Sequence, residues 1–406
     1  MGTSPATYRR GQTFDAGLAL SLSVGYNRRM DWVTLRSEFP VTDSWVYMDH
    51  AAVAPLPSAA RQVLIDWADD VARNGVVNNG AWQKQIERIR ERFATLLHAH
   101  PQDIAFVKNT SEGIGIVAEG LHWQRGDNLV SVEGEYPANV YPWLNLADRG
   151  VEYRAVPLCQ GRVIMDELAA AIDARTRLVT ISFVEFATGF RNDLDRIGQL
   201  CRDRGVLFFV DAIQGLGVLP LDVEKTPVDF LAADGHKWLV GPEGAGILWI
   251  RRDCLEQLHP VGIGWNSVVD PFDFSKIDFR LKPHAGRYES GTLNVPGILA
   301  LGASLDLLLR LGVSAISQRI RELTDRLCAG IERTNWHVYS SRRDQEWSGI
   351  VSLQSPDGIE PMKVVRLLRQ RGVVVNARAG RLRISPHCYN SPEEIDRLVD
   401  LLGELA

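Results

Sequence analysis

The sequence predicts an α/β protein with a large domain on a mostly parallel sheet between helices and a smaller α+β domain at its carboxyl end. Three observations lead to this fold class. Apolar runs alternate with helical segments over residues 104–250, as in parallel strands joined by right-handed crossovers. The 406 residues exceed what one hydrophobic core holds, which favours two domains. Two of the apolar runs end in charged residues, as buried strands do where they deliver side chains to a ligand at the sheet edge.

The composition predicts a soluble globular protein and argues against nucleic-acid, membrane and metal partners. Hydrophobic residues make up 45% and charged residues 23% of the chain, which is ordinary for a soluble globular protein. The net charge of -5 predicts no nucleic-acid partner, and no apolar run is long enough to cross a bilayer, so we expect no membrane association. The five cysteines show no CxxC or metal-ligand spacing, which favours free thiols, a cytoplasmic location and no metal site. For residues 1–29 we expect a disordered tail.

The elements before residue 104 are a short helix and strand, followed by two amphipathic helices that cover the sheet. They are expected over residues 31–39, 45–48, 59–74 and 82–98. A strand over 104–108 then leads through a short turn into a helix. Hydroxyls and free N–H groups at a helix start bind anions, so Thr110 and Ser111 are candidates for a phosphate site.

The same helix contains a possible dinucleotide fingerprint. Gly113, Gly115 and Ala118 follow a strand, and Glu133 comes about twenty residues later, as such a fingerprint requires. The fingerprint's glycines must form the turn itself, whereas here residues 109–112 form the turn. We therefore expect both glycines inside the helix, and an NAD-binding oxidoreductase is only a distant alternative.

The alternating pattern continues to residue 250 and is followed by two long helices and the small domain. Further strands are expected over 129–132, 152–156, 178–183, 206–210, 230–233 and 247–250, and helices over 139–148, 165–172, 195–204, 299–309 and 314–331. In the small domain we expect strands over 350–353, 373–376 and 382–385, and helices over 361–371 and from 391. The predicted large domain is 46–295, and the small domain is 30–45 plus 296–406.

Two strand ends bring an acid and an amine together. The run over 206–210 ends in Asp211, and the run over 230–233 is followed closely by Lys237. A lysine with a depressed pKa forms a Schiff base with an aldehyde, and an aspartate beside a pyridine nitrogen keeps that nitrogen protonated. Pyridoxal phosphate (PLP) is the cofactor that needs both groups. Gln214 is spaced to donate a hydrogen bond to the phenolic oxygen of the ring.

The surrounding motifs resemble a known family. Asp211-x-x-Gln214, Gly235-His236-Lys237-Trp238 and Gly241-Pro242-x-Gly244 are similar to the class V aminotransferases, a group of fold-type I PLP enzymes. That group also holds cysteine desulfurases, kynureninase and isopenicillin N epimerase. The resemblance covers the chain from about Trp45 to its end and implies a seven-stranded central sheet.

The resemblance also implies roles for individual residues. It places Thr110 and Ser111 on the cofactor phosphate, and Tyr136 flat on the ring, where relatives often carry histidine. His236 is expected to reach the phosphate or the ring edge. It implies a homodimer with shared active sites, in which Thr292 touches the phosphate of the partner subunit. Arg383 matches the arginine that clamps the carboxylate of an amino acid substrate, although Arg378 and Arg381 compete for this role.

Two further residues have open roles. His50 either faces the substrate or serves the structure. Asp234 is expected to orient His236 or to cap a turn, because a carboxylate would repel a phosphate.

The expected reaction is that of a class V aminotransferase, with Lys237 moving the α-proton of the substrate. Epimerisation and C–S lysis on the same fold stay open as alternatives. A cysteine desulfurase needs a nucleophilic cysteine just ahead of the carboxylate-binding arginine, and residues 372–382 contain none. Cys388 comes after Arg383 and is expected to be a small buried residue, so a persulfide relay is not expected.

Overall fold

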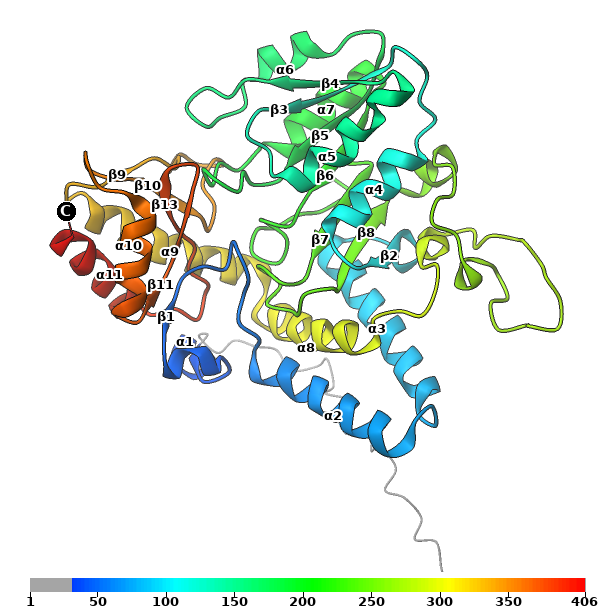
Figure 1. Ribbon diagram of the computed structural model, residues 1–406, viewed down its shortest axis with the longest axis horizontal. Helices are drawn as coiled ribbons and strands as arrows, with labels where there is room; N and C mark the ends of the chain where they lie inside the picture. Colours follow the sequence, from blue (N-terminus) through cyan, green and yellow to red (C-terminus); the bar gives the residue numbers. More distant parts are fainter. Residues whose placement is uncertain (1–30, 406) are drawn as a thin grey trace, which may run out of the picture. The chain divides into compact units, whose positions relative to one another are not determined.

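A seven-stranded sheet lies at the centre of the protein in the computed structural model, which describes residues 31–405 (Figure 1). The strand order is β2-β8-β7-β6-β5-β3-β4, and only β8 runs antiparallel to its neighbours. This confirms the mostly parallel sheet. The strands are β2 (Ile104–Val107), β3 (Asn128–Val132), β4 (Glu152–Val156), β5 (Thr176–Ser182), β6 (Leu207–Asp211), β7 (Phe230–Asp234) and β8 (Gly246–Ile250). The expected tail at residues 1–29 lies outside the described residues.

Both faces of this sheet are buried, which explains its continuous apolar runs. In β6, Phe208 and Val210 pack into one hydrophobic core, whereas Phe209 packs into the core on the opposite face. Helices α4 (Thr110–Gly120) and α5 (Tyr141–Leu144) contribute to the core around Phe209. Helices α3 (Asn79–Leu97), α6 (Met165–Ala171), α7 (Leu194–Arg204) and α8 (Val295–Leu311) contribute to the other core.

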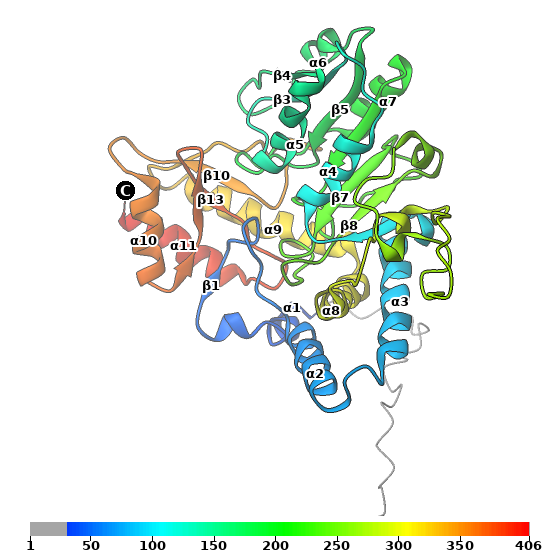
Figure 2. The same cartoon turned by 45° about the vertical axis from the view of Figure 1, so that its right-hand side comes forward.

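The carboxyl-terminal part forms a second sheet with its own core (Figure 2). Its strand order is β12-β13-β10-β9, and all three pairings are antiparallel. The strands are β9 (His337–Val338), β10 (Val351–Gln354), β12 (Asn376–Arg378) and β13 (Arg381–Ile384), and the helices are α9 (Val313–Ile331), α10 (Pro361–Gln370) and α11 (Pro392–Glu404). The chain before the large sheet forms α1 (Trp32–Arg36), β1 (Val46–Tyr47) and α2 (Ser58–Asn74).

Strand β1 lies beside the small domain, although it comes more than 300 residues before the strand with which it pairs (Figure 1). It pairs in parallel with β11 (Val373–Val374), and Val46 and Met48 are part of the small-domain core. We therefore propose that the first boundary between the small and large domains falls after Met48, three residues later than the sequence alone suggests.

Two expected elements differ from the observed ones. The helix expected over 139–148 is a single α-turn, α5, between two 3₁₀ turns, because Pro137 and Pro142 each remove a backbone donor. The strand expected over 373–376 is divided at Val375, since β11 pairs with β1 and β12 pairs with β13. Within residues 31–405 no single helix is long and apolar enough to cross a membrane; α8 and α9 reach that measure only together, with a bend of 81° between them.

Candidate active site

A cavity of about 500 Å³ opens where β6 and β7 end. It is lined by parts of the large sheet, the loop after β1 and the hairpin of β12 and β13. Eight of the ten residues singled out from the sequence line it: Thr110, Ser111, Tyr136, Asp211, Gln214, His236, Lys237 and Arg383. Because β6 and β7 are paired neighbours, the acid and the amine reach the same edge, as expected.

Lys237 lies in the turn after β7 and is only 7% exposed. Burial lowers the pKa of its amine to about 8, although the nearby Asp211 carboxylate acts in the opposite direction. The Nζ atom also lies 5.3 Å from the centre of the Tyr136 ring. A buried amine that loses its proton near neutral pH is suited to nucleophilic attack on an aldehyde.

Asp211 ends β6 and is fully buried at the cavity wall. Its Oδ1 accepts a hydrogen bond from the Ile213 backbone at 3.0 Å. Burial raises the pKa of this carboxyl to about 6, and the Lys237 ammonium lowers it in part. A positively charged ring nitrogen at this position would favour the carboxylate form.

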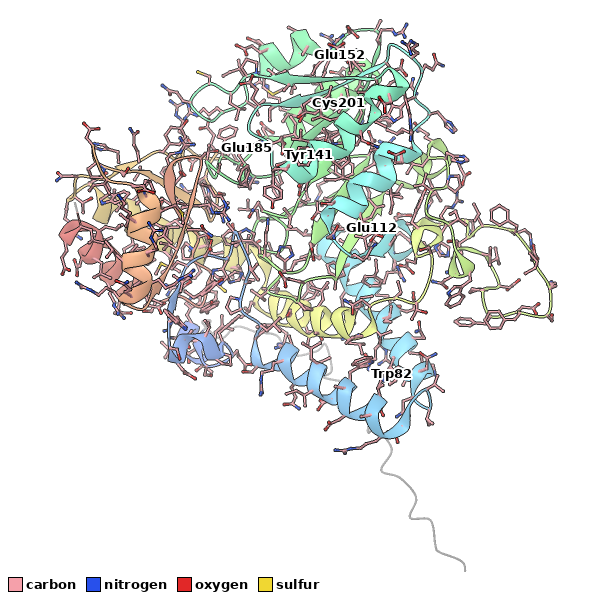
Figure 3. The ribbon with its side chains drawn as sticks, viewed as in Figure 1. Trp82, Glu112, Tyr141, Glu152, Glu185 and Cys201 are labelled. Atoms are coloured by element: carbon pink, nitrogen blue, oxygen red, sulfur yellow. The ribbon has the colours of Figure 1, made fainter. Side chains whose placement is uncertain are left out.

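Two further buried carboxyl groups lie close to Asp211, and the sequence did not single them out. Glu135 accepts two hydrogen bonds of 2.6 Å, from the backbone and the hydroxyl of Ser182, which is paired with Asp211 across the sheet. Glu185 follows β5 on the segment that faces the small domain (Figure 3) and accepts a hydrogen bond from Asn192. Burial raises the pKa of both groups, that of Glu135 to about 7, and the Asp211 carboxylate raises both further by repulsion.

Gln214 is held from both ends of its amide. Its Oε1 accepts a hydrogen bond from the Trp238 indole at 2.9 Å, and its Nε2 donates to the Ala51 carbonyl at 3.0 Å. An amide nitrogen carries two hydrogens, so the second one is left for a ligand in the cavity.

The start of α4 supplies the polar end of the cavity. Asn109 caps the helix by accepting from the Glu112 backbone at 2.9 Å. The Thr110 hydroxyl accepts a hydrogen bond from the Asp234 backbone, which leaves its own hydrogen free to donate. With the first N–H groups of the helix, this makes an anion site. Gly113 lies inside the helix, where an added Cβ would come within 2.7 Å of Ala232 on β7, so the dinucleotide turn does not form.

Asp234 and His236 adjoin this anion site. Asp234 Oδ1 accepts from the Gly235 backbone at 2.7 Å, and its Oδ2 lies 2.9 Å from His236 Nδ1, although the ring is not aligned for a hydrogen bond. The Asp234 carboxylate thus caps the turn at Gly235, which is one of the two roles left open from the sequence, and it also lies beside His236.

Arg383 projects from β13 and is 1% exposed. One end of its guanidinium donates to Asp49 at 3.3 Å and the other to the Phe186 carbonyl at 3.0 Å. Its Nε is buried and has no partner among the described residues. Buried donors are normally paired, so a carboxylate ligand would complete this guanidinium.

The other two candidate arginines, Arg378 and Arg381, differ in whether they line the cavity. Arg378 lines the cavity beside Arg383, whereas Arg381 does not and stacks on the Tyr339 ring at 4.0 Å. Sequence spacing cannot distinguish Arg381 from the other two. Asp49, which directly precedes His50 and pairs with Arg383, was also not singled out from the sequence.

Two expected site residues do not line the cavity. His50 is fully buried, and its ring nitrogens lie within hydrogen-bond distance of the Ser385 carbonyl at 2.9 Å and the Tyr389 hydroxyl at 2.8 Å. The expectation that it faces the substrate is therefore corrected: His50 connects the loop after β1 to the small domain. Thr292 is exposed and does not line the cavity of its own chain, so its expected role toward a partner subunit stays a prediction.

The residues present fit PLP. The cavity has a volume typical of small-molecule sites. It offers a buried lysine of lowered pKa, a buried aspartate and a helix start with free donors, which are the groups that the aldehyde, ring nitrogen and phosphate require. The fold and this site define a PLP-dependent enzyme of fold type I.

Comparison with known proteins gives the family. Residues 46–398 match the family described as Aminotransferase class-V, so the chain belongs to that family. A probable cysteine desulfurase of Methanothermobacter thermautotrophicus is 31% identical over 92% of this chain and 97% of its own length.

Two solved structures of C-DES are similar in fold. One carries glycine covalently linked to the PLP cofactor and has a TM-score of 0.86 at 26% identity, covering 91% of this chain and 99% of that chain. The other shows the cystine C-S lyase C-DES with its product cysteine persulfide, with a TM-score of 0.85 at 27% identity over 90% of this chain and 99% of that chain. The protein is therefore a PLP-dependent enzyme, and the family and fold expected from the sequence are confirmed.

Proposed function

We propose that PLP is held by the residues that line the cavity, with Lys237 as its covalent anchor. In this assignment Asp211 faces the ring nitrogen, Gln214 donates to the phenolic oxygen and Tyr136 lies against the ring. Thr110, Ser111 and His236 hold the phosphate, and Arg383 binds the carboxylate of an amino acid. The observation that supports the proposal most is that residues from three separate parts of the chain meet in one cavity.

PLP, when bound, supplies an electron sink for the bonds at the α-carbon of an amino acid. The chain supplies the rest. Arg383 orients the substrate, and Asp211 favours a protonated ring nitrogen. Lys237 takes the α-proton on Nζ, which its lowered pKa makes possible near neutral pH. Tyr136 and Phe186, which lie edge to face at 5.2 Å, cover one side of the site with apolar surface.

The reaction that we favour is cleavage of the C–S bond of a sulfur-containing amino acid, without a cysteine relay. Breaking the Cα–H and Cβ–S bonds releases a thiol or persulfide and leaves an enamine, which water converts to pyruvate and ammonia without any change of oxidation state. Relatives named cysteine desulfurase and C-S lyase support a sulfur substrate. None of the five cysteines lines the cavity, and burial raises the pKa of the Cys388 thiol to about 12, so the sulfur product would leave directly.

Transamination is the second candidate, because the family match and the Lys237 position serve it equally well. Its product would be the keto acid that matches the substrate, with the amino group retained on the cofactor. The holoenzyme should be incubated with L-cystine, L-cysteine and L-alanine, and pyruvate, ammonia, sulfur products, keto acids and racemised amino acid measured. Pyruvate with ammonia and persulfide supports the lyase, and a matching keto acid without ammonia contradicts it.

The cofactor assignment has its own test. The purified protein should show a near-visible absorbance band from the bound cofactor. Borohydride should reduce the Schiff base and leave the cofactor permanently attached to Lys237. Lys237→Ala should lose the fixed adduct, whereas Lys225→Ala, at an exposed lysine paired with Asp222, should keep it. A reducible adduct in the Lys237→Ala protein would show that another lysine holds the cofactor. Cys388→Ala should keep its turnover if no persulfide relay exists.

The proposed assembly is a homodimer with shared active sites, and the proposed location is the cytoplasm. The exposed position of Thr292 supports the first, because a residue that serves a partner subunit must reach the surface. The five free cysteines support the second.

A further inference from the structure

Arg378 is a cation of the cavity wall to which the proposed function gives no task. Its Nη1 donates to two neutral groups, Asn376 Oδ1 and the Ala377 carbonyl, both at 2.8 Å. Its Nε and Nη2 donate to no group in the described part of the chain, and Arg378 forms no ion pair there.

The other cations of the cavity have partners. The side chain of Lys108 pairs with Glu112 at 3.2 Å, and Arg383 pairs with Asp49 at 3.3 Å. Lys237 is assigned to the cofactor. A guanidinium presents a planar fork that matches a carboxylate, and an unpaired one in a cavity is therefore a candidate anion-binding group.

Arg378 lies on the substrate side of the cavity. Asn376 connects it to Asp49, because the Asn376 amide donates to Asp49 Oδ2 at 2.7 Å while its oxygen accepts from Arg378. The same carboxylate thus organises both arginines. The anion site for the phosphate, by contrast, lies at the start of α4 on the large domain.

The two arginines differ in depth. Arg383 is fully buried and offers its unpartnered Nε, whereas Arg378 is half-buried and lies nearer the opening. Both arginines line the same cavity, so a substrate whose α-carboxylate lies on Arg383 and whose side chain points toward the opening can bring the end of that side chain to Arg378.

We infer that Arg378 binds a second carboxylate on the side chain of the substrate, so that the enzyme selects amino acids with two carboxylates. This inference rests on the proposed function, since it assumes that Arg383 holds the α-carboxylate. Acidic amino acids and cystine, which carries a carboxylate at each end, belong to this class.

The experiment measures binding to the holoenzyme by the change in its near-visible absorbance. L-Aspartate, L-glutamate and L-cystine are compared with L-asparagine, L-glutamine and L-alanine. We expect at least one dicarboxylic amino acid to half-saturate at a concentration about tenfold or more below its neutral counterpart, as one charge-assisted contact provides. Arg378→Gln should remove this preference and leave the neutral amino acids within about twofold, while Arg378→Lys, which keeps the charge, should retain part of it.

A matched control removes the same charge from the neighbouring strand. Arg381→Gln changes the residue that pairs with Arg378 across the hairpin but does not line the cavity, and it should not change the preference. Equal weakening of all amino acids in Arg378→Gln would overturn the inference, because Arg378 would then share the α-carboxylate. The absence of any preference in the unmodified enzyme would also overturn it, with the proposed function intact. If no amino acid changes the spectrum, the proposed function itself fails.

Discussion

Asp49 and Arg383 form a buried ion pair of 3.3 Å across 334 positions of the sequence. Asp49 lies on the loop after β1, and Arg383 lies on β13 of the small domain. The pair holds the guanidinium at the cavity wall, where its Nε is left without a partner. If Arg383 binds the substrate as proposed, the position of the small domain and substrate binding both depend on the Asp49 carboxylate.

Asp49→Asn should destabilise the protein and weaken substrate binding together. Removing one partner leaves a buried charge uncompensated, which costs about 3 kcal/mol or more of unfolding free energy. Urea unfolding measures this, and amino acid titration of the holoenzyme should show about tenfold weaker binding. Asp396→Asn is the control, because its pair with Arg326 is about half exposed and should contribute less than about 1 kcal/mol. Equal effects of the two substitutions would contradict a special role for Asp49.

Lys237 should react as a free amine at unusually low pH. Its lowered pKa predicts that amine-specific labelling of the cofactor-free protein rises through a midpoint near pH 8, well below the ordinary lysine value of 10.5. The Asp211 carboxylate raises the pKa of Lys237, so Asp211→Asn should move this midpoint to still lower pH. Peptide mass spectrometry after pulses of reagent at different pH values measures both. A midpoint at the ordinary value would show that Lys237 is not desolvated.

Glu135 should make stability fall as the pH rises. Burial raises its pKa from 4.5 to about 7, so the folded protein binds this proton more tightly than the unfolded chain does. The resulting stabilisation is complete below pH 4.5 and is lost as the pH rises through about 7.

Glu135→Gln mimics the protonated group, because its Oε1 can accept from the Ser182 backbone while its Nε2 donates to the Ser182 hydroxyl oxygen. The free energy of unfolding of this variant, relative to that of the unmodified protein, should rise by up to about 3 kcal/mol as the pH is raised from acidic values to about 8. Urea unfolding of the cofactor-free proteins across this range measures the gain. Glu133→Gln, near in sequence but exposed, should show no such trend. A pH-independent difference for Glu135→Gln would contradict the buried proton.

Mixing subunits tests the shared active site. Lys237→Ala and Thr292→Ala should each be inactive or strongly impaired as homodimers. In a mixed dimer, the Thr292→Ala subunit supplies Lys237 and the Lys237→Ala subunit supplies Thr292, so one of the two sites is complete. About half of the dimers in a refolded equal mixture are mixed, so about a quarter of the normal activity should return. No recovery, with mixed dimers demonstrated by mass spectrometry, would place both residues in the same subunit's site.

The sequence by itself determined the α/β class, the two strands whose ends bring Asp211 and Lys237 together, and the cofactor that suits these two residues. Those features follow from local patterns: continuous apolar runs buried on both faces of the sheet, and polar residues at the strand ends. The helix start at Thr110 was predictable for the same reason, because capping depends on residues three positions apart.

The tertiary structure alone decided the substrate side of the site. No pattern within one segment relates Asp49 to Arg383, assigns Arg378 rather than Arg381 to the cavity, or buries Glu135 and Glu185 beside Asp211. The tertiary structure also shows that His50 does not line the cavity, because both of its ring nitrogens contact the small domain. The contacts of Asp49 and His50 with the small domain join segments more than 300 residues apart, and their geometry is fixed only when the small domain packs against the edge of the large sheet. Glu135, Glu185 and Asp211 come from separate segments of the large domain that only the assembled sheet brings together.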